Sequence, residues 1–352
     1  MAHIFKYPKE SNKGIIVFTH KEWPWLLQNA QSVLNDLKQY FFLGWNQGTY
    51  FGNIQMPPIV DFAFTTPSVL DFEDNGNTLK IPLLDRNFLS SDFKNLNINN
   101  KYIDIISVSR AAKIKHLPDF MYAIRKLNDR GIYPNTLMVV PTSMDETDEN
   151  ANTDIVELYL KLFSPEEQKN ITLMRLSKEL GFMGMSPTMI NWFYNNSKVL
   201  YIGSKSEGTC RVVHEGLIGG CNIVYYNNHK GGLVDYLNDT NSVSYNTHNE
   251  IDTALEVCLK NYEYSKEVVD SYDSILSERN AVNNLTPYFT ELYDKNKQSF
   301  DGKLIHCDNL SLRLPSHYFD VDWKNPQSDI RAADIKSVEQ LTNFINCINK
   351  AI

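Results

Sequence analysis

The sequence predicts an α/β protein whose parallel sheets carry helices on both faces, divided into two domains. Short apolar runs rich in β-branched residues alternate with helical patterns over most of the chain, which is typical of parallel strands joined by crossover helices. The length of 352 residues exceeds the ~250–300 residues at which a single core stops growing. A hydrophobic fraction of 42% with 22% charged residues favours a globular chain over a disordered one.

Each element follows from the periodicity of its apolar residues. A β-branched run entered through Gly14 predicts a first strand over 14–20, and apolar residues at helical spacing predict a helix over 23–42. Further strands are expected at 57–66, 79–84, 102–108, 136–140, 171–176, 198–202 and 222–226. Further helices are expected at about 117–127, 153–163, 187–194, 209–218 and 337–348.

Composition excludes several classes of protein. A net charge of −8 argues against a nucleic-acid partner, which needs clustered Lys and Arg. The five cysteines lie far apart without a C-x2-C pair, so we expect reduced thiols rather than disulfides or a structural zinc site. No apolar run approaches ~18 residues, and the N-terminus lacks the apolar core of a signal peptide. We therefore expect a soluble, cytoplasmic protein without an integral membrane segment. The sequence does not predict the oligomeric state.

The segment 204–216 carries the strongest functional signal. A predicted strand ends in a small-residue loop, and a helix is expected to start close to Gly208 and Thr209. Free N–H groups at such a helix start can hold a diphosphate, and ligands of parallel sheets bind outside the carboxyl ends of the strands. Glu207 should lie at the helix mouth and Glu215 about two turns in, where both can meet one extended ligand. Alternatively, Glu207 only complements the helix dipole and Glu215 faces solvent.

Two motifs in this order resemble a known family. The E-x7-E spacing of Glu207 and Glu215, followed by the pair Gly231-Gly232, resembles the donor-sugar segment of family-4-like glycosyltransferases (glycosyl transferases group 1, the E-x7-E retaining type). Upstream, Arg110 and Lys115 resemble the R-x4-K element of that family. The alternative explanation of this element is a solvated basic helix start, which is a common feature. The similarity covers about residues 102–237, and within it Gly216 stands where the family usually has alanine.

The resemblance implies the GT-B fold, in which two Rossmann-like domains face each other across a cleft. Residues 1–100 would form the N-terminal, acceptor-side domain, completed by the C-terminal segment 295–352. Residues 101–294 would form the domain that binds the nucleotide-sugar donor.

The resemblance also implies roles for individual residues. Glu207 would contact hydroxyls of the transferred sugar, and Glu215 would hold the ribose. Arg110 and Lys115 would neutralise the diphosphate as charge grows on the leaving group. Backbone amides would support the sugar and phosphate, from Gly208, Thr209 and Cys210. The nucleobase is expected near Met174, Arg175, Leu176 and Met185, although methionines are also common core filler.

The implied reaction is retaining transfer of a hexose-type sugar from a nucleotide-diphosphate sugar to a glycan or another hydroxyl acceptor. The expected donor is a GDP- or UDP-sugar. The leaving phosphate would take the acceptor's proton, so neither a metal nor another cofactor is expected. On the acceptor side, His20 follows the first strand and Asp61 lies in the second. A lone histidine is more often a satisfied surface residue than a ligand.

Three other functions fit parts of the pattern. A GT-B sugar-nucleotide epimerase or hydrolase would release an epimer or free sugar without an acceptor. A non-catalytic carbohydrate-binding protein would keep the fold but has no need of the four charged residues. A metal-dependent GT-A transferase would need an Asp-x-Asp motif, and Asp320-Val321-Asp322 has that form.

Overall fold

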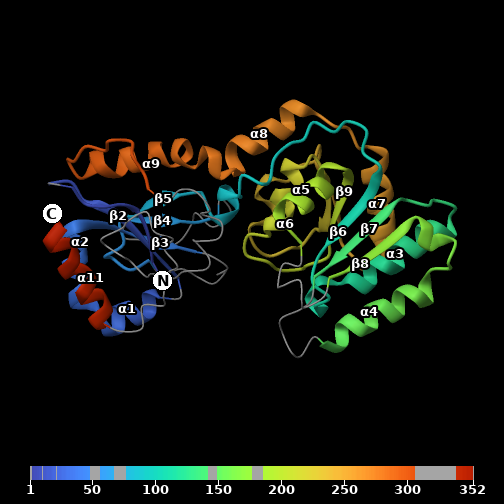
Figure 1. The fold of residues 1–352 in the computed structure, drawn as a ribbon, viewed down its shortest axis with the longest axis horizontal. Coiled ribbons are helices and arrows are strands. Elements are labelled where there is room, and N and C mark those ends of the chain that lie inside the picture. Colours follow the sequence, from blue (N-terminus) through green and yellow to red (C-terminus); the bar gives the residue numbers. More distant parts are fainter. Residues whose placement is uncertain are drawn as a thin grey trace. The chain divides into compact units, whose positions relative to one another are not determined.

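The computed structural model describes residues 2–9, 11–20, 22–47, 56–66, 77–141, 149–176, 185–305 and 338–351. They fold into two compact units (Figure 1). Unit 1 comprises residues 1–90 and 275–352, and unit 2 comprises residues 91–274. The boundary expected at 100 falls at 90. The boundary expected at 294 falls at 274, because the helix over Ala281–Lys295 packs into the core of unit 1.

Unit 1 is built on a five-stranded sheet in the order β1-β2-β3-β4-β5. Strands β2 to β5 are parallel, and β1 pairs antiparallel with β2. The strands are β1 (Ala2–Lys6), β2 (Gly14–Thr19), β3 (Phe41–Asn46), β4 (Phe62–Phe64) and β5 (Leu79–Ile81). The single helix predicted over 23–42 is wrong: two helices are separated at Ala30, and a strand that the prediction missed begins at Phe41.

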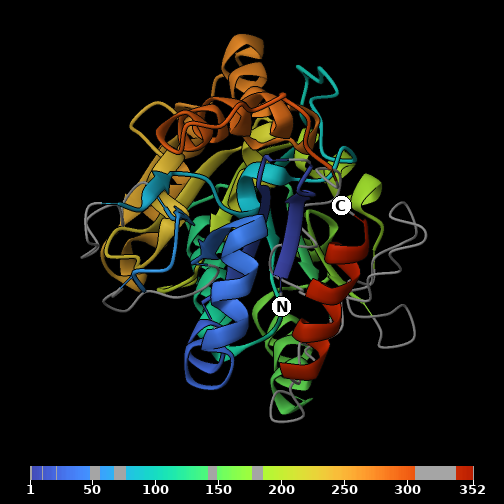
Figure 2. The same ribbon diagram turned by 90° about the vertical axis from the view of Figure 1, so that its left-hand side faces the viewer.

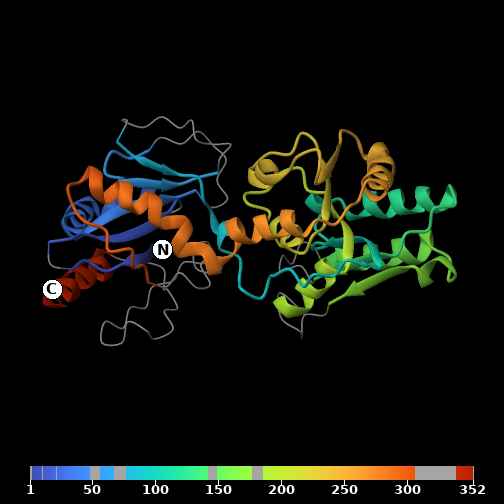
Figure 3. The same cartoon turned by 90° about the horizontal axis from the view of Figure 1, so that it is seen from above.

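Helices cover both faces of this sheet. Along β2, Ile16 and Phe18 face one core while Ile15 and Val17 face another, as the two-residue period of a strand requires. The first face is covered by α1 (Trp23–Asn29), α2 (Gln31–Tyr40) and α11 (Val338–Ala351), and the second by α9 (Ala281–Lys295). Figure 2 shows α11 (red) beside α2 (blue), and Figure 3 shows α9 (orange) along the sheet. The last helix of the chain thus belongs to the same core as the first two.

Unit 2 is built on a six-stranded sheet in the order β11-β10-β9-β6-β7-β8, with every pair of neighbours parallel. The strands are β6 (Ile103–Val108), β7 (Thr136–Val140), β8 (Ile171–Arg175), β9 (Ser197–Ile202), β10 (Asn222–Tyr226) and β11 (Ser242–Tyr245). One face carries α3 (Leu117–Asp129), α4 (Glu149–Leu162) and α7 (Ile251–Lys260), and the other carries α5 (Pro187–Asn195) and α6 (Arg211–Ile218) (Figure 1). The predicted parallel α/β architecture is confirmed, and β11 is an additional strand.

A buried lysine fixes the far end of α6 against the sheet. Lys101 is 6% exposed, and its Nζ donates to the carbonyl oxygens of Ser197, Gly219 and Gly220 at 2.9, 2.6 and 2.9 Å. Burial lowers the pKa of this ammonium. Because a cation is favourable at a helix C-terminus, Lys101 stabilises α6 in the place where it presents its first turn to the site described below.

Two smaller predictions concern the thiols and the membrane. In the described part of the chain, Cys210, Cys221 and Cys258 are buried free thiols, as expected. Among the described segments, no helix combines the length and the apolar character that a membrane crossing requires.

Candidate functional site

The strand order of unit 2 selects one edge of the sheet as a ligand site. Counted along the chain, its strands lie in the order 3-2-1-4-5-6, with β6 as the first and β9 as the fourth. The chain therefore reverses direction across the sheet between β6 and β9. In doubly wound sheets, ligands bind outside the carboxyl ends of the strands at such a switch point. The loops after β6 and β9 carry both motifs singled out from the sequence.

The loop after β6 holds the two cations of the R-x4-K motif. Arg110 lies in this loop, half-buried, and makes no ion pair with any described residue. Lys115 ends a short 3-10 turn, and the following His116 has a left-handed backbone with φ of 50°. The helix predicted over about 117–127 follows this turn and begins at Leu117, as expected. Both cations are thus presented by a loop rather than by a helix.

The loop after β9 is supported by the segment that contains the glycine pair. Lys230 donates its amide to the carbonyl of Lys205 at 3.0 Å and accepts from the amide of Glu207 at 3.1 Å. The amide of Gly232 donates to the carbonyl of Gly208 at 2.9 Å. The segment with the glycine pair therefore stabilises the loop that carries Glu207 and Gly208 through backbone hydrogen bonds.

The helix after this loop starts later than expected. Cys210, with φ of 40°, precedes α6, which begins at Arg211 and is eight residues long. Glu215 is its fifth residue, so it lies a little more than one turn in rather than two. Gly208, Thr209 and Cys210 lie buried in the loop between Glu207 and the helix.

The two loops meet in an ion pair. The Lys115 ammonium pairs with the carboxylate of Glu207, which also accepts from the hydroxyl of Ser204. Burial by itself would raise the pKa of Glu207, but the Lys115 charge and hydrogen bonds to the carboxylate lower it below its ordinary value. Gly203 permits this approach, because a Cβ there would collide with the carbonyl oxygen of Lys115. The structure thus brings together one residue from each predicted motif.

Glu215 lies in a more buried environment. It is 7% exposed, accepts from the hydroxyl of Tyr194 at 3.3 Å, and lies 3.6 Å from the guanidinium of Arg211. Burial raises the pKa of Glu215 above its ordinary value, although the Arg211 charge and the Tyr194 hydrogen bond oppose this. Its carboxylate is therefore held at a desolvation cost, which is common in sites that bind a polar ligand. The alternative of a solvated face is wrong for Glu215.

Gly216 explains one departure from the family pattern. An added Cβ at this position would lie 2.5 Å from a terminal methyl of Leu200 on β9. The leucine side chain thus occupies the space that the usual alanine methyl would take.

The structure also identifies a residue that the sequence analysis missed. His229 is 9% exposed, and neither of its ring nitrogens has a hydrogen-bond partner among the residues that the structure describes. Burial lowers its pKa; the nearby Glu207 acts to raise it and Lys115 to lower it further. Its only signal in the sequence is its place two residues before the glycine pair. His229 is therefore a buried polar group beside the Lys115–Glu207 pair.

The residues expected around a nucleobase lie on the sheet edge formed by β8. Met174 is half-buried, Arg175 is exposed and Leu176 is buried, all at the carboxyl end of that strand. In the sheet, β7 lies between β8 and β6. Met185 is half-buried and precedes α5.

The two acceptor-side candidates are not brought together in unit 1. His20 is half-buried directly after β2, at the carboxyl end of the parallel strands. Asp61 directly precedes β4, where it accepts from the amide of Leu43 at 2.9 Å and pairs with Lys38 at 3.1 Å. These contacts show that Asp61 joins neighbouring elements of the fold. The Asp-x-Asp motif at 320–322 lies outside the described residues.

Comparisons with known proteins establish the fold. No family model matches the sequence, and no curated protein is significantly similar to it. Among solved structures, sucrose-phosphate synthase from Thermosynechococcus elongatus matches with a TM-score of 0.53 and 14% identity, over 80% of this chain and 74% of that one. TarM matches with a TM-score of 0.52 and 11% identity, over 79% and 54%.

A third match is the pneumococcal O-GlcNAc transferase GtfA in complex with UDP and GlcNAc. Its TM-score is 0.50 at 12% identity, over 75% of this chain and 54% of that one. The chain thus spans about half the length of the GtfA and TarM structures. These neighbours are glycosyltransferases of one architecture, and the parallel sheets and strand order described above agree with it. The chain therefore has the GT-B glycosyltransferase fold.

Proposed function

We propose that the protein is a retaining glycosyltransferase that transfers a hexose-type sugar from a nucleotide-diphosphate sugar to a hydroxyl acceptor, with no metal required for the transfer step. The observation that carries this proposal is the Lys115–Glu207 pair at the switch point of the unit 2 sheet. Two loops that are distant in sequence meet there. One supplies a cation that can bind phosphate, and the other supplies a carboxylate that can accept hydrogen bonds from sugar hydroxyls.

The Lys115–Glu207 ion pair can be replaced by contacts to an anionic ligand. When a diphosphate arrives, Lys115 exchanges the carboxylate for phosphate oxygens, and Arg110 supplies a second cation. Glu207 is then free to accept hydrogen bonds from hydroxyls of the sugar. The buried carboxylate of Glu215 accepts from the ribose hydroxyls in the same way.

The proposed transfer step uses these groups. The bond between the anomeric carbon and the diphosphate oxygen breaks, and the acceptor oxygen bonds to the same face of the sugar. The acceptor's proton passes to an oxygen of the leaving diphosphate. The two cations stabilise the charge that develops on that leaving group, which is the task a metal performs in other transferases.

A glycan is the proposed acceptor, and a UDP- or GDP-sugar is the proposed donor. UDP is the first nucleotide to try, because the GtfA structure holds UDP and GlcNAc. A sugar-nucleotide epimerase or hydrolase uses the same donor site and is separated from a transferase by its products.

Calorimetric titration with UDP, GDP and ADP, with and without chelator, tests the donor site. We expect selective binding of one nucleotide and weaker binding by Arg110→Ala. Lys113→Ala is the matched control, since Lys113 is an exposed cation three residues away. Failure of all three nucleotides to bind a folded sample would contradict the proposal and favour a non-catalytic protein.

Product analysis tests the reaction. Incubating the nucleotide-sugar with a mixture of glycans should yield a product in which NMR shows the anomeric configuration of the donor. An inverted linkage would refute the retaining mechanism. Free sugar or an epimer, formed at the same rate without any acceptor, would identify a hydrolase or an epimerase instead.

A further inference from the structure

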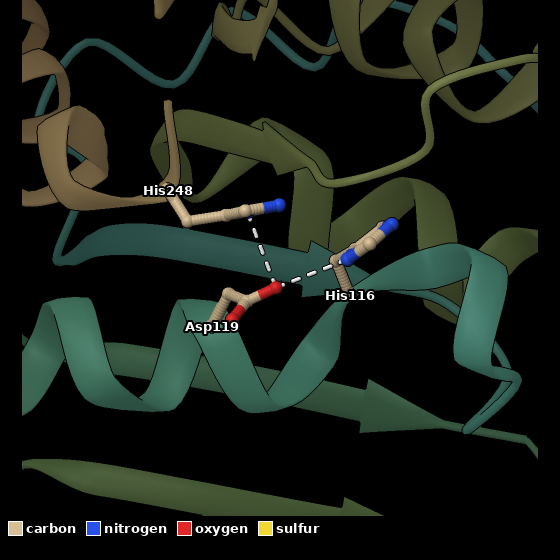
Figure 4. Close-up of side chains that lie close together, drawn as sticks. All are labelled: His116, Asp119 and His248. Atoms are coloured by element: carbon tan, nitrogen blue, oxygen red, sulfur yellow. Dashed lines mark hydrogen bonds and ion pairs between the residues drawn. The ribbon is translucent and has the colours of Figure 1, made fainter. Parts of the chain in front are cut away.

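A second cluster of polar side chains lies in unit 2, at the same edge of the sheet. Figure 4 shows His116, Asp119 and His248 directed toward one another. The Nδ1 atom of His116 lies 3.0 Å from Oδ2 of Asp119, and the Nδ1 atom of His248 lies 3.2 Å from the same oxygen. One potential ligand atom from each residue lies within 4.8 Å of the other two.

The backbone places these groups from two separate segments. His116, with its left-handed backbone, immediately precedes α3, and Asp119 lies in the first turn of that helix. His248 begins a 3-10 turn between β11 and α7. The two imidazole rings stack with centroids 4.8 Å apart and planes 29° apart. Each ring therefore presents its Nδ1 edge to the one carboxylate oxygen between them.

We propose that His116, Asp119 and His248 form a binding site for a first-row transition-metal ion such as Zn²⁺. Two imidazole nitrogens and one carboxylate oxygen are a common set of protein ligands for these ions. A tetrahedral ion held at ~2.0–2.1 Å from its ligands keeps those ligands about 3.3 Å apart. The two separations to Asp119 are close to this value, and the two imidazole nitrogens lie within 4.8 Å of each other, so we expect an ion to fit after small rotations of the rings.

The exposure of the cluster agrees with an ion that exchanges with solvent. The side chains of His116, Asp119 and His248 are 25%, 34% and 35% exposed. A metal can therefore enter, and water can occupy the remaining coordination position, as in three-ligand zinc sites. Mg²⁺ and Ca²⁺ prefer all-oxygen ligands and fit this set poorly.

The ion would join the loop after β6 to the loop after β11. His116 directly follows Lys115 in the chain, so the metal would hold the loop that carries Arg110 and Lys115 in place. This role positions the loop and takes no part in the transfer chemistry. It also does not depend on the proposed function, because metal binding is measured without any nucleotide.

The test uses tag-free, chelator-treated protein over its full length. Titration with Zn²⁺ should show one ion bound per chain, and Co²⁺ should give the visible absorption of a nitrogen- and oxygen-ligated site. Mg²⁺ should not compete. Zn²⁺ should also raise the thermal midpoint, since a ligand that binds only the folded state stabilises it.

Variants assign the binding to this cluster. His248→Gln and Asp119→Asn each remove a proposed ligand, so each should weaken Zn²⁺ binding by at least the roughly 10–100-fold that loss of an outer-shell partner costs, while circular dichroism shows an unchanged fold. His3→Gln in unit 1 and Asp129→Asn at the other end of α3 are matched controls that should bind like the wild type. The proposal is overturned if the wild type binds no Zn²⁺, or if binding survives in both cluster variants. Metal-stimulated nucleotide binding without loss in these variants would equally place the ion elsewhere.

Discussion

Lys115 and Glu207 form an ion pair although 92 positions separate them in the sequence. Each comes from a loop that follows one of two adjacent strands, β6 and β9. The two loops can approach closely because Gly203 has no side chain. The two charges compensate each other, which keeps two partly buried ions paired. A ligand that offers phosphate to one partner and hydroxyls to the other can replace the pair without leaving either group unsatisfied.

Lys115→Met should weaken nucleotide-diphosphate binding by about ten- to a hundredfold. Hydrogen bonds to charged groups contribute roughly 1.5–3 kcal/mol, and every 1.4 kcal/mol is a factor of about ten in affinity. Isothermal titration with the preferred nucleotide measures the effect. Lys113→Met should bind like the wild type, and equal losses in both variants would show that the effect is only one of net charge.

Glu215→Gln should separate binding from stability. The amide cannot accept as strongly from ribose hydroxyls, so affinity should fall by about tenfold or more. The folded-state pKa of Glu215 is raised, so ionisation above its ordinary pKa disfavours the fold. Removing that charge should therefore raise the thermal midpoint at neutral pH. Glu263→Gln, at an exposed position, should change neither quantity, whereas a lower midpoint for Glu215→Gln would contradict the assignment.

Gly203→Ala should disrupt the site, and Gly216→Ala should be far milder. A methyl group at position 203 meets the backbone carbonyl of Lys115, while at position 216 it meets the mobile end of the Leu200 side chain. We expect a loss of roughly 1–3 kcal/mol of unfolding free energy for the first and a clearly smaller loss for the second. Urea unfolding monitored by fluorescence compares the two, and equal losses would show that Lys115 moves freely.

His229 should make the folded protein sensitive to mild acid. Its folded-state pKa lies below the ordinary value of 6.5, so above pH 6.5 the ring is neutral in both states and contributes nothing. As the pH falls below 6.5, the unfolded chain takes up the proton first and the fold loses up to about 1.4 kcal/mol per pH unit. His229→Gln should reduce this slope in denaturant titrations between pH 7 and 5. Parallel slopes for variant and wild type would show that His229 is already paired.

Leu341→Ala should destabilise unit 1 by roughly 2–5 kcal/mol, because this side chain of α11 is only 2% exposed in a core shared with α1 and α2. Deleting residues 338–352 should cost at least as much. Differential scanning calorimetry should show a shift in one transition only, that of unit 1. Asn343→Ala, at an exposed position of the same helix, is the control, and a deletion with an unchanged thermogram would show that the helix is dispensable.

The sequence by itself determined the architecture and the charged residues of the candidate site. Strand and helix periods are local properties, so most elements of unit 2 were predictable within a few residues, as β7 and α3 show. The strand at Phe41–Asn46 was missed because its apolar residues directly continue a helical pattern. The E-x7-E and R-x4-K spacings pointed to the two loops that lie at the switch point of the sheet, because each motif lies within one segment.

The tertiary structure decided which of these residues meet. The strand order places the loops after β6 and β9 side by side, which no local pattern encodes, and so pairs Lys115 with Glu207. The same packing buries His229 beside them and brings His248 to His116 and Asp119 across more than a hundred positions. Contacts between distant segments arise from the way sheets and helices bury their apolar faces together. Charge, burial and metal-binding potential at this edge are therefore properties of the fold rather than of any one motif.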